Sequence, residues 1–183
     1  MEPGRHYLFF ALRPAAEAAE RLCGLAADLR KRYRMTGRPV APDRLHISLN
    51  FVADLAAPDP QVVDRASAAV AGVAFPAFAV ALDRMVTWGR GDGARPIVMR
   101  SDDGLLGVEG LHRTLHGALA QAGLAPRRER AFEPHLTLLR DKAVVPLEFV
   151  DTVAWTAREF VLLNSVRGEG RHEVLGRWPL GGP

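Results

Sequence analysis

Two short stretches of the sequence, RLHISLNFV and EPHLTLLR, each place a histidine two residues before a hydroxyl side chain. In the first stretch these residues are His46 and Ser48, and in the second they are His135 and Thr137. Both stretches alternate polar and apolar residues, which is typical of a strand with one buried face. Because successive side chains point to opposite faces, we expect each histidine to share the open face with its hydroxyl partner.

Two histidines and two hydroxyls suit proton transfer around an anion. Histidine gives or takes a proton near neutral pH, so one ring of a pair can act as a base while the other acts as an acid. Serine and threonine donate hydrogen bonds to an anion without adding charge. The set therefore fits in-line displacement at phosphorus. No carboxylate cluster accompanies the motifs, so the sequence implies no metal ion and no other cofactor.

The elements that must position these motifs follow each other in a repeated order. In the first half, strands are expected over residues 6–12, 44–52 and 78–88, with helices after Pro14 and after Asp59. In the second half, a strand over 95–100 precedes a helix that Asp102 or Asp103 caps and Gly123 ends. The second motif strand, a helical or turn segment around 147–153, and strands over 158–166 and 172–180 complete the chain.

The spacing of the two motifs indicates a degenerate duplication. His6 begins the first strand of the first half, and His46 lies 40 residues after it. Arg95 begins the equivalent strand of the second half, and His135 lies 40 residues after it. We therefore predict an α+β fold with antiparallel sheet and a pseudo-twofold relation between two lobes. One domain would span residues 1–183, with intertwined sequence halves of about 1–90 and 91–183.

Composition limits the remaining classes of protein. The chain has 183 residues, 48% hydrophobic and 25% charged, with no apolar run long enough for a membrane span and no convincing signal peptide. The single Cys23 excludes an internal disulfide and favours a reducing, cytoplasmic setting. All but two of the 24 cationic residues are arginine, which fits either an anionic substrate or a genome that favours arginine codons.

Taken together, the motifs resemble those of the two-histidine (2H) phosphoesterases, and within them the RNA 2′,3′-cyclic phosphodiesterases, historically called 2′-5′ RNA ligases. The stretch RHYLFFAL is similar to that family's opening strand, and FVLLNSV with GRWPL is similar to its closing strand and tail. FEPHLTLLR resembles its second motif, with Pro134 before the histidine and Arg140 after it. The chain departs from the family at Ser48, where threonine is commoner, and at His172, where tyrosine is frequent.

The resemblance implies a fold in which two antiparallel sheets face a central cleft, with helices outside. It implies metal-independent opening of an RNA 2′,3′-cyclic phosphate to a 2′-phosphate. On this pattern His46 is the proton donor, His135 is the proton acceptor, and Ser48 and Thr137 bind the phosphate. The partner would be RNA with a cyclic phosphate end, tRNA fragments among them. A cytoplasmic monomer without membrane contact is expected.

Several further residues and functions remain open. Arg130, Arg140, Phe9 and Asn50 are candidate substrate contacts, each with a structural alternative. His112 and His116 have the spacing of metal ligands on a helix, but a solvated helix face is the favoured interpretation. The competing functions are reversible 2′-5′ joining of RNA ends, hydrolysis of a small cyclic nucleotide, and RNA binding without catalysis.

Overall fold

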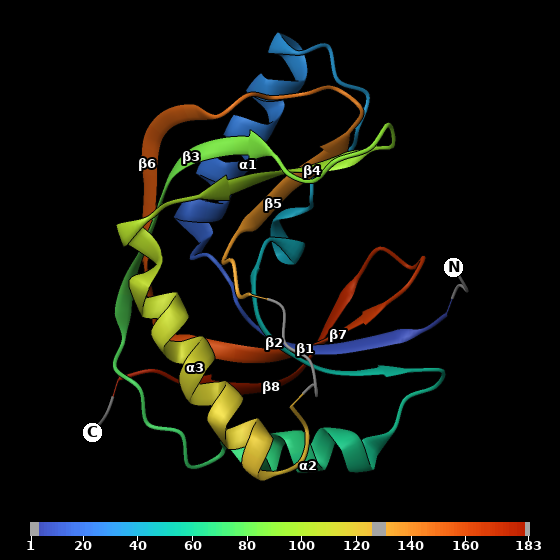
Figure 1. Ribbon diagram of the computed structural model, residues 1–183, viewed down its shortest axis with the longest axis vertical. Helices are drawn as coiled ribbons and strands as arrows, with labels where there is room; N and C mark the ends of the chain where they lie inside the picture. Colours follow the sequence, from blue (N-terminus) through green and yellow to red (C-terminus); the bar gives the residue numbers. More distant parts are fainter. Residues whose placement is uncertain (1–3, 126–130, 182–183) are drawn as a thin grey trace.

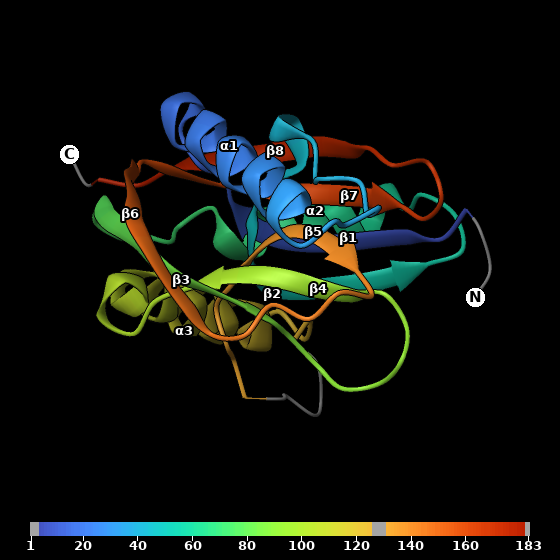
Figure 2. The same cartoon turned by 90° about the horizontal axis from the view of Figure 1, so that it is seen from above.

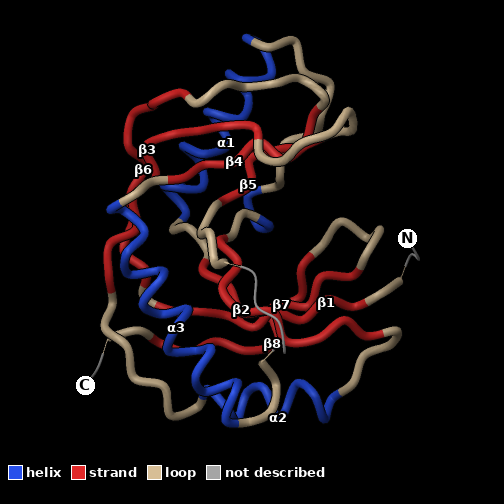
Figure 3. The backbone as a smooth tube through the Cα atoms, in the orientation of Figure 1, coloured by secondary structure: helices blue, strands red, loops and turns tan. Residues whose placement is uncertain are grey.

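The structure is a computed structural model that describes residues 4–125 and 131–181. Within these ranges, eight strands form one antiparallel sheet in the order β6-β3-β4-β5-β2-β1-β7-β8 (Figure 1, Figure 3). The strands are β1 His6–Leu12, β2 Ile47–Leu55, β3 Phe78–Thr87, β4 Arg95–Arg100, β5 Leu136–Asp141, β6 Glu148–Ala157, β7 Glu159–Val166 and β8 His172–Pro179.

The sheet is narrowest at its centre. In the described part of the chain, one residue pair, Ile47 with Leu136, joins β2 to β5. On one side of this seam lie β2, β1, β7 and β8, and on the other lie β5, β4, β3 and β6, in the lower and upper parts of Figure 1. The expectation of two sheets therefore differs from the observed single sheet, because antiparallel pairing continues across the seam. Each side also mixes strands from both halves of the sequence.

Three helices of the described chain cover the sheet: α1 Ala16–Arg32, α2 Pro60–Val70 and α3 Leu106–Gln121. Helix α1 buries Leu22, Ala26 and Leu29 and packs against β5 and β6. Helix α3 packs against β2 and β3, and α2 packs against α3. Seen from above, α1 and α3 lie on opposite sides of β3 and β4 (Figure 2). None of the described helices is long and apolar enough to cross a membrane.

Local signals in the sequence predict most element ends. The Asp59 side chain accepts a hydrogen bond from the Gln61 backbone N–H at 2.9 Å, so it caps α2 as expected. Gly123 follows α3 with a φ of 69°, a conformation that favours glycine. The prediction that Asp102 or Asp103 caps the helix is wrong, because the N-cap residue of α3 is Leu105. The Asp102 side chain has another partner. Its carboxylate bonds Arg84 at 2.9 Å, and a 3-10 turn, η2 (Asp103–Leu105), precedes α3 instead.

The expected helical or turn segment around residues 147–153 is also wrong, because these residues enter strand β6. Buried Val153, Trp155 and Ala157 alternate with exposed neighbours, which is the period of a strand at the edge of a sheet. Among the described residues of the second half, no helix stands in the place of the second helix that a strict repeat would require. Phe149 on this strand is 72% exposed although it is apolar. An apolar residue on the exposed face interrupts the alternation of polar and apolar residues by which a strand is predicted from sequence.

Candidate active site

The two histidine motifs meet at the seam of the sheet. His46 immediately precedes β2, and His135 immediately precedes β5. The residues that follow them, Ile47 and Leu136, are fully buried and form the pair that joins the two strands. Extending this antiparallel register by one residue in each direction places His46 across from Thr137 and Ser48 across from His135.

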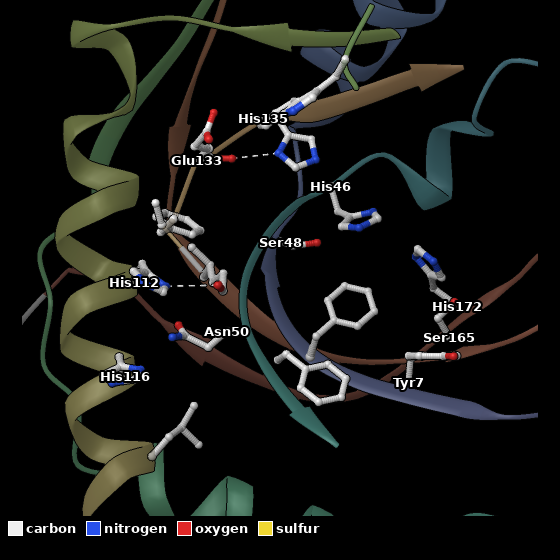
Figure 4. Close-up of a pocket in the computed structure, with 17 residues that line it drawn as sticks. Tyr7, His46, Ser48, Asn50, His112, His116, Glu133, His135, Ser165 and His172 are labelled. Atoms are coloured by element: carbon white, nitrogen blue, oxygen red, sulfur yellow. Dashed lines mark hydrogen bonds between the residues drawn. The ribbon is translucent and has the colours of Figure 1, made fainter. Parts of the chain in front are cut away.

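Two adjoining cavities share the motif residues. A smaller cavity of about 280 Å³ is lined by both histidines, both hydroxyls, Val40, Arg44, Arg140 and His172. A larger cavity of about 990 Å³ shares His46, Ser48, His135 and His172 with it and extends to α3. Figure 4 shows His46, Ser48 and His135 around one common space. The smaller cavity fits an anion between two polar motifs, and the larger one has the volume of a nucleotide site.

The two histidine rings are held by the same kind of hydrogen bond to a backbone carbonyl. Nδ1 of His46 lies 2.7 Å from the Arg44 carbonyl oxygen. Nδ1 of His135 lies 2.8 Å from the Glu133 carbonyl oxygen (Figure 4). A carbonyl oxygen only accepts, so Nδ1 of each ring carries the hydrogen. Each neutral ring therefore has its Nε2 lone pair available, and each charged ring can donate from Nε2.

The side chains beside the two rings carry opposite charges. Arg44 lies two residues before His46, whereas Glu133 lies two residues before His135. Burial lowers the pKa of His46, and the positive charges of His135, Arg44 and Arg13 lower it further, against the hydrogen bond to the Arg44 carbonyl. Burial also lowers the pKa of His135, as do the charges of Arg100 and Arg140, whereas the hydrogen bond to the Glu133 carbonyl and the Glu133 charge act in the opposite direction. The two rings are thus alike in backbone geometry and different in electrostatics.

Three aromatic residues fix the orientation of the histidine rings. The Phe9 ring centroid lies 5.2 Å from that of His46, and the His172 centroid lies 4.9 Å from it, edge-on. Trp88 packs edge-on against His135 at 4.3 Å, with the Arg100 guanidinium 4.8 Å from the Trp88 ring centroid. These contacts limit rotation of both rings, so each Nε2 is held in a defined direction.

His172 is a third histidine in the site. Burial, followed by the charge of His46, lowers its pKa to about 4, so the ring is neutral at physiological pH. It stands on the first residue of β8 and lines both cavities. The sequence marks it as a departure from a frequent tyrosine, and the structure shows that this departure lies beside His46 (Figure 4).

Three of the four further candidate substrate contacts line one of the two cavities. Arg140 lines the smaller cavity, and Phe9 and Asn50 line the larger one. Phe9 belongs to the cleft rather than to the main core, and Asn50 is only 5% exposed. Arg130 lies outside the described residues.

The interpretation of His112 and His116 as a solvated helix face is wrong for His112. Its ring is buried, stacks on Phe132 at 3.7 Å, and places Nδ1 3.1 Å from the Leu49 carbonyl oxygen. Both histidines line the larger cavity. Among the described residues, no group of three His, Cys, Asp or Glu side chains is arranged to hold a metal ion.

Sequence reasoning missed Arg44 and Trp88 as site residues. Arg44 lies beside the first motif, but nothing in the local pattern distinguishes it from the many other arginines. Trp88 follows β3, far from either motif in sequence, and reaches His135 only through the β3–β4 pairing. The position of Trp88 depends on tertiary structure, and so does the placement of the Arg44 side chain in the cavity.

Comparisons with known proteins agree with this geometry. A family model described as LigT-like phosphoesterase matches residues 12–98. The RNA 2′,3′-cyclic phosphodiesterase of Escherichia coli (strain K12) is 32% identical over 192 aligned residues, which cover 98% of each chain. The chain belongs to the LigT-like phosphoesterase family.

Solved structures of this family share the fold over its whole length. E. coli LigT in complex with 3′-AMP is 29% identical to this chain, with a TM-score of 0.74. The alignment covers 99% of this chain and 100% of the LigT chain. E. coli LigT in complex with phosphate is 27% identical with a TM-score of 0.72, with 100% of both chains covered. E. coli LigT therefore binds a nucleotide and an inorganic anion on this overall fold.

The burial of both histidines gives a measurable shift of titration. In the free protein we expect both rings to have a pKa below the usual histidine range, because burial disfavours the charged form of each ring. Long-range ¹H–¹⁵N NMR spectra, assigned with single variants, would follow each ring. A pKa of either ring at or above the usual histidine range would contradict the expectation.

Proposed function

We propose that this protein hydrolyses RNA 2′,3′-cyclic phosphate ends to 2′-phosphates by metal-independent acid/base catalysis with His46 and His135. The observation that carries the proposal is the seam, where the antiparallel register gathers both histidines and both hydroxyls around one cavity. Full-length similarity to the E. coli RNA 2′,3′-cyclic phosphodiesterase supports the substrate class. A neutral ring and a charged ring with Nε2 directed at one anion are what in-line hydrolysis requires.

In the proposed reaction, His135 takes a proton from water at Nε2 as the water oxygen bonds to phosphorus. The P–O3′ bond breaks, and His46 gives its Nε2 proton to O3′, which leaves a 2′-phosphate and a free 3′-hydroxyl. Ser48 and Thr137 donate hydrogen bonds to the non-bridging oxygens. The lowered pKa of His135 supports its role in this assignment, because a general base must be neutral before it takes the proton.

The proposal extends to the surroundings of the site. Arg140 would contact an RNA phosphate, Phe9 would pack against the terminal nucleoside, and Asn50 would bind it through its amide. Arg130 is a further candidate phosphate contact on the sequence alone. The mirror-like strand order on the two sides of the seam supports a pseudo-twofold duplication. We further propose a cytoplasmic monomer whose substrates include tRNA fragments. The single Cys23, half-buried in α1, is compatible with reducing conditions.

An assay in EDTA tests the function. An oligoribonucleotide that ends in a 2′,3′-cyclic phosphate would be incubated with the protein, and the product end identified by mass and by phosphatase sensitivity. We expect a gain of one water and a phosphatase-sensitive 2′-phosphate. Products joined through 2′-5′ linkages would instead reveal the reverse reaction. Failure to open the ring would refute the proposal, and activity that EDTA abolishes would refute metal independence.

The two hydroxyls have a smaller but separate expected effect. Ser48→Ala and Thr137→Val should each lower kcat/KM by about 10-fold, the usual contribution of one hydrogen bond to a charged group. Thr137→Ser is the matched control, since it keeps the hydroxyl and removes only the methyl group. Steady-state kinetics on the same oligonucleotide measure the effect. If Thr137→Val and Thr137→Ser behave alike, the hydroxyl does not bind the phosphate.

A further inference from the structure

Arg44 is a second guanidinium at the anion cavity. It ends the 3-10 turn η1 (Pro42–Arg44) and lines the smaller cavity, where Arg140 of β5 also lies. Its Nε is buried and has no hydrogen-bond partner among the described residues. A buried guanidinium nitrogen without an acceptor is costly, and an oxyanion in the cavity would supply that acceptor.

The position of Arg44 relative to His46 is fixed by the backbone. The Arg44 carbonyl oxygen accepts the hydrogen bond from Nδ1 of His46, so the two residues form one local unit. The side chain runs toward the β7–β8 turn, where a Cβ at Gly170 would lie 3.9 Å from Nη1 of Arg44. The guanidinium therefore stands on the His46 side of the cavity. At the matching place on the other side stands Glu133, which pairs with Arg100 at 3.3 Å.

The charge of the reacting phosphate changes during hydrolysis. A cyclic phosphodiester is a monoanion, and removal of a proton from the attacking water gives the pentacoordinate phosphorus a second negative charge. The 2′-phosphate product is also largely a dianion at neutral pH, because its second pKa is about 6. One guanidinium neutralises the single charge of the substrate, and a second guanidinium stabilises the charge that develops during the reaction.

We propose that Arg44 is a catalytic residue that stabilises the second negative charge of the phosphate on the leaving-group side. This inference rests on the proposed function, in which His46 protonates O3′ on that same side. Its role differs from that of Ser48 and Thr137, whose hydrogen bonds form equally well with the monoanionic substrate. Arg44 acts on the transition state and the product more than on the bound substrate.

The test uses a nucleoside 2′,3′-cyclic monophosphate, which has no phosphate except the reacting one. Arg44→Gln should lower kcat by about 10- to 100-fold, with a change in KM of about threefold or less. The inhibition constant of the nucleoside 2′-monophosphate should rise by about 10-fold in the same assay. Arg44→Lys, which keeps the charge without the planar fork, should fall between Arg44→Gln and the unchanged protein.

Arg13→Gln is the matched control. Its charge also acts on His46 and His172, but its guanidinium bonds the Asp43 carbonyl at 2.8 Å outside the cavity. We expect its kcat to stay within about twofold of the unchanged protein. Thermal unfolding of each variant identifies any loss of kcat caused by misfolding, and Arg44→Lys then provides the comparison in a folded chain.

Two results would overturn the role of Arg44. Equal effects of Arg44→Gln and Arg13→Gln would reduce it to a distant charge, and a loss confined to oligonucleotides would place Arg44 on a phosphate of the RNA chain. If the unchanged protein opens no cyclic phosphate, the proposed function fails instead. Calorimetric binding of the 2′-monophosphate still decides the present inference in that case, because undiminished affinity of Arg44→Gln for this dianion would refute it.

Discussion

Replacing either His46 or His135 with asparagine should lower the turnover of a cyclic phosphate end by about 10²- to 10⁴-fold, the usual contribution of a general acid or base. The asparagine amide can donate to the carbonyl oxygen that now accepts from Nδ1, so the loop and strand around it should remain in place. What is lost is Nε2 and its proton. Single-turnover kinetics with the oligonucleotide substrate would measure the chemical step directly.

The same two variants distinguish the donor from the acceptor. A substrate with a nitrophenolate leaving group needs no proton from the enzyme, so it should restore much of the activity of His46→Asn and none of that of His135→Asn. The opposite result would reverse the two roles. His6→Asn is the matched control, because His6 lies on β1 and is not among the described residues that line either cavity. Near-normal turnover in either active-site variant would remove that ring from the mechanism.

Replacing Asp141 with alanine should lower the free energy of unfolding by about 3 kcal/mol, because several charge-assisted hydrogen bonds are lost together. Asp141 is buried at the end of β5. Its carboxylate accepts hydrogen bonds from the backbone N–H groups of Thr36 at 2.9 Å, Gly37 at 2.6 Å and Ala143 at 2.8 Å. Without it, these donors would be left unpaired beside the strand.

The Asp141 contacts also hold the loop that leads to the first motif. A Cβ at Gly37 would lie 2.0 Å from the Arg140 carbonyl oxygen, so only glycine allows the loop to approach β5 this closely. Val40 then donates its backbone N–H to the Leu138 carbonyl oxygen at 2.7 Å. Loss of Asp141 should therefore weaken activity as well as stability, since η1 and His46 follow directly along the chain.

The pH dependence gives a specific check on Asp141. The backbone N–H groups, those of Ala143 and Gly37 first, lower the pKa of this carboxyl below its usual range. A lowered pKa in the folded state means that the stabilisation is present above the unfolded pKa and is lost as the pH falls through the folded pKa. Urea unfolding at pH 7 should show the full difference between Asp141→Ala and the unchanged protein, and strongly acidic pH should reduce it. A difference that does not depend on pH would mean that the charge is not responsible.

The sequence predicts the strands that carry the motifs because their apolar residues alternate over a long enough run. The first strand, His6–Leu12, and Arg95–Arg100 agree with the structure at both ends. Strand β6 was missed because it lies at an edge, where half of its residues face solvent and the apolar signal is weak. The single sheet was missed because pairing between β2 and β5 is set by tertiary contacts and not by local pattern.

The site residues also divide into those that local sequence pattern predicts and those that depend on tertiary contacts. The positions of His46 and His135 could be predicted because chemistry and periodicity coincide in both motifs. The buried environment of His112 could not, since it depends on Phe132 and on the Leu49 carbonyl oxygen, which come from other parts of the chain. The opposite charges of Arg44 and Glu133 are visible in the sequence. Only the structure shows that the two residues hold equivalent positions, because the carbonyl oxygen of each accepts a hydrogen bond from Nδ1 of a motif histidine.

The seam between β2 and β5 has a mechanical consequence. The two sides of the sheet are joined there by Ile47 and Leu136, and the catalytic rings stand immediately beside that pair. Helix α3 packs against β2 on one side of the seam and against β3 on the other, and one hydrophobic core spans both sides. The distance between the two rings is therefore held by the core and not by this pair alone. An anion bound by Ser48 and Thr137 at once would add one more link, made by the substrate itself, between the two sides.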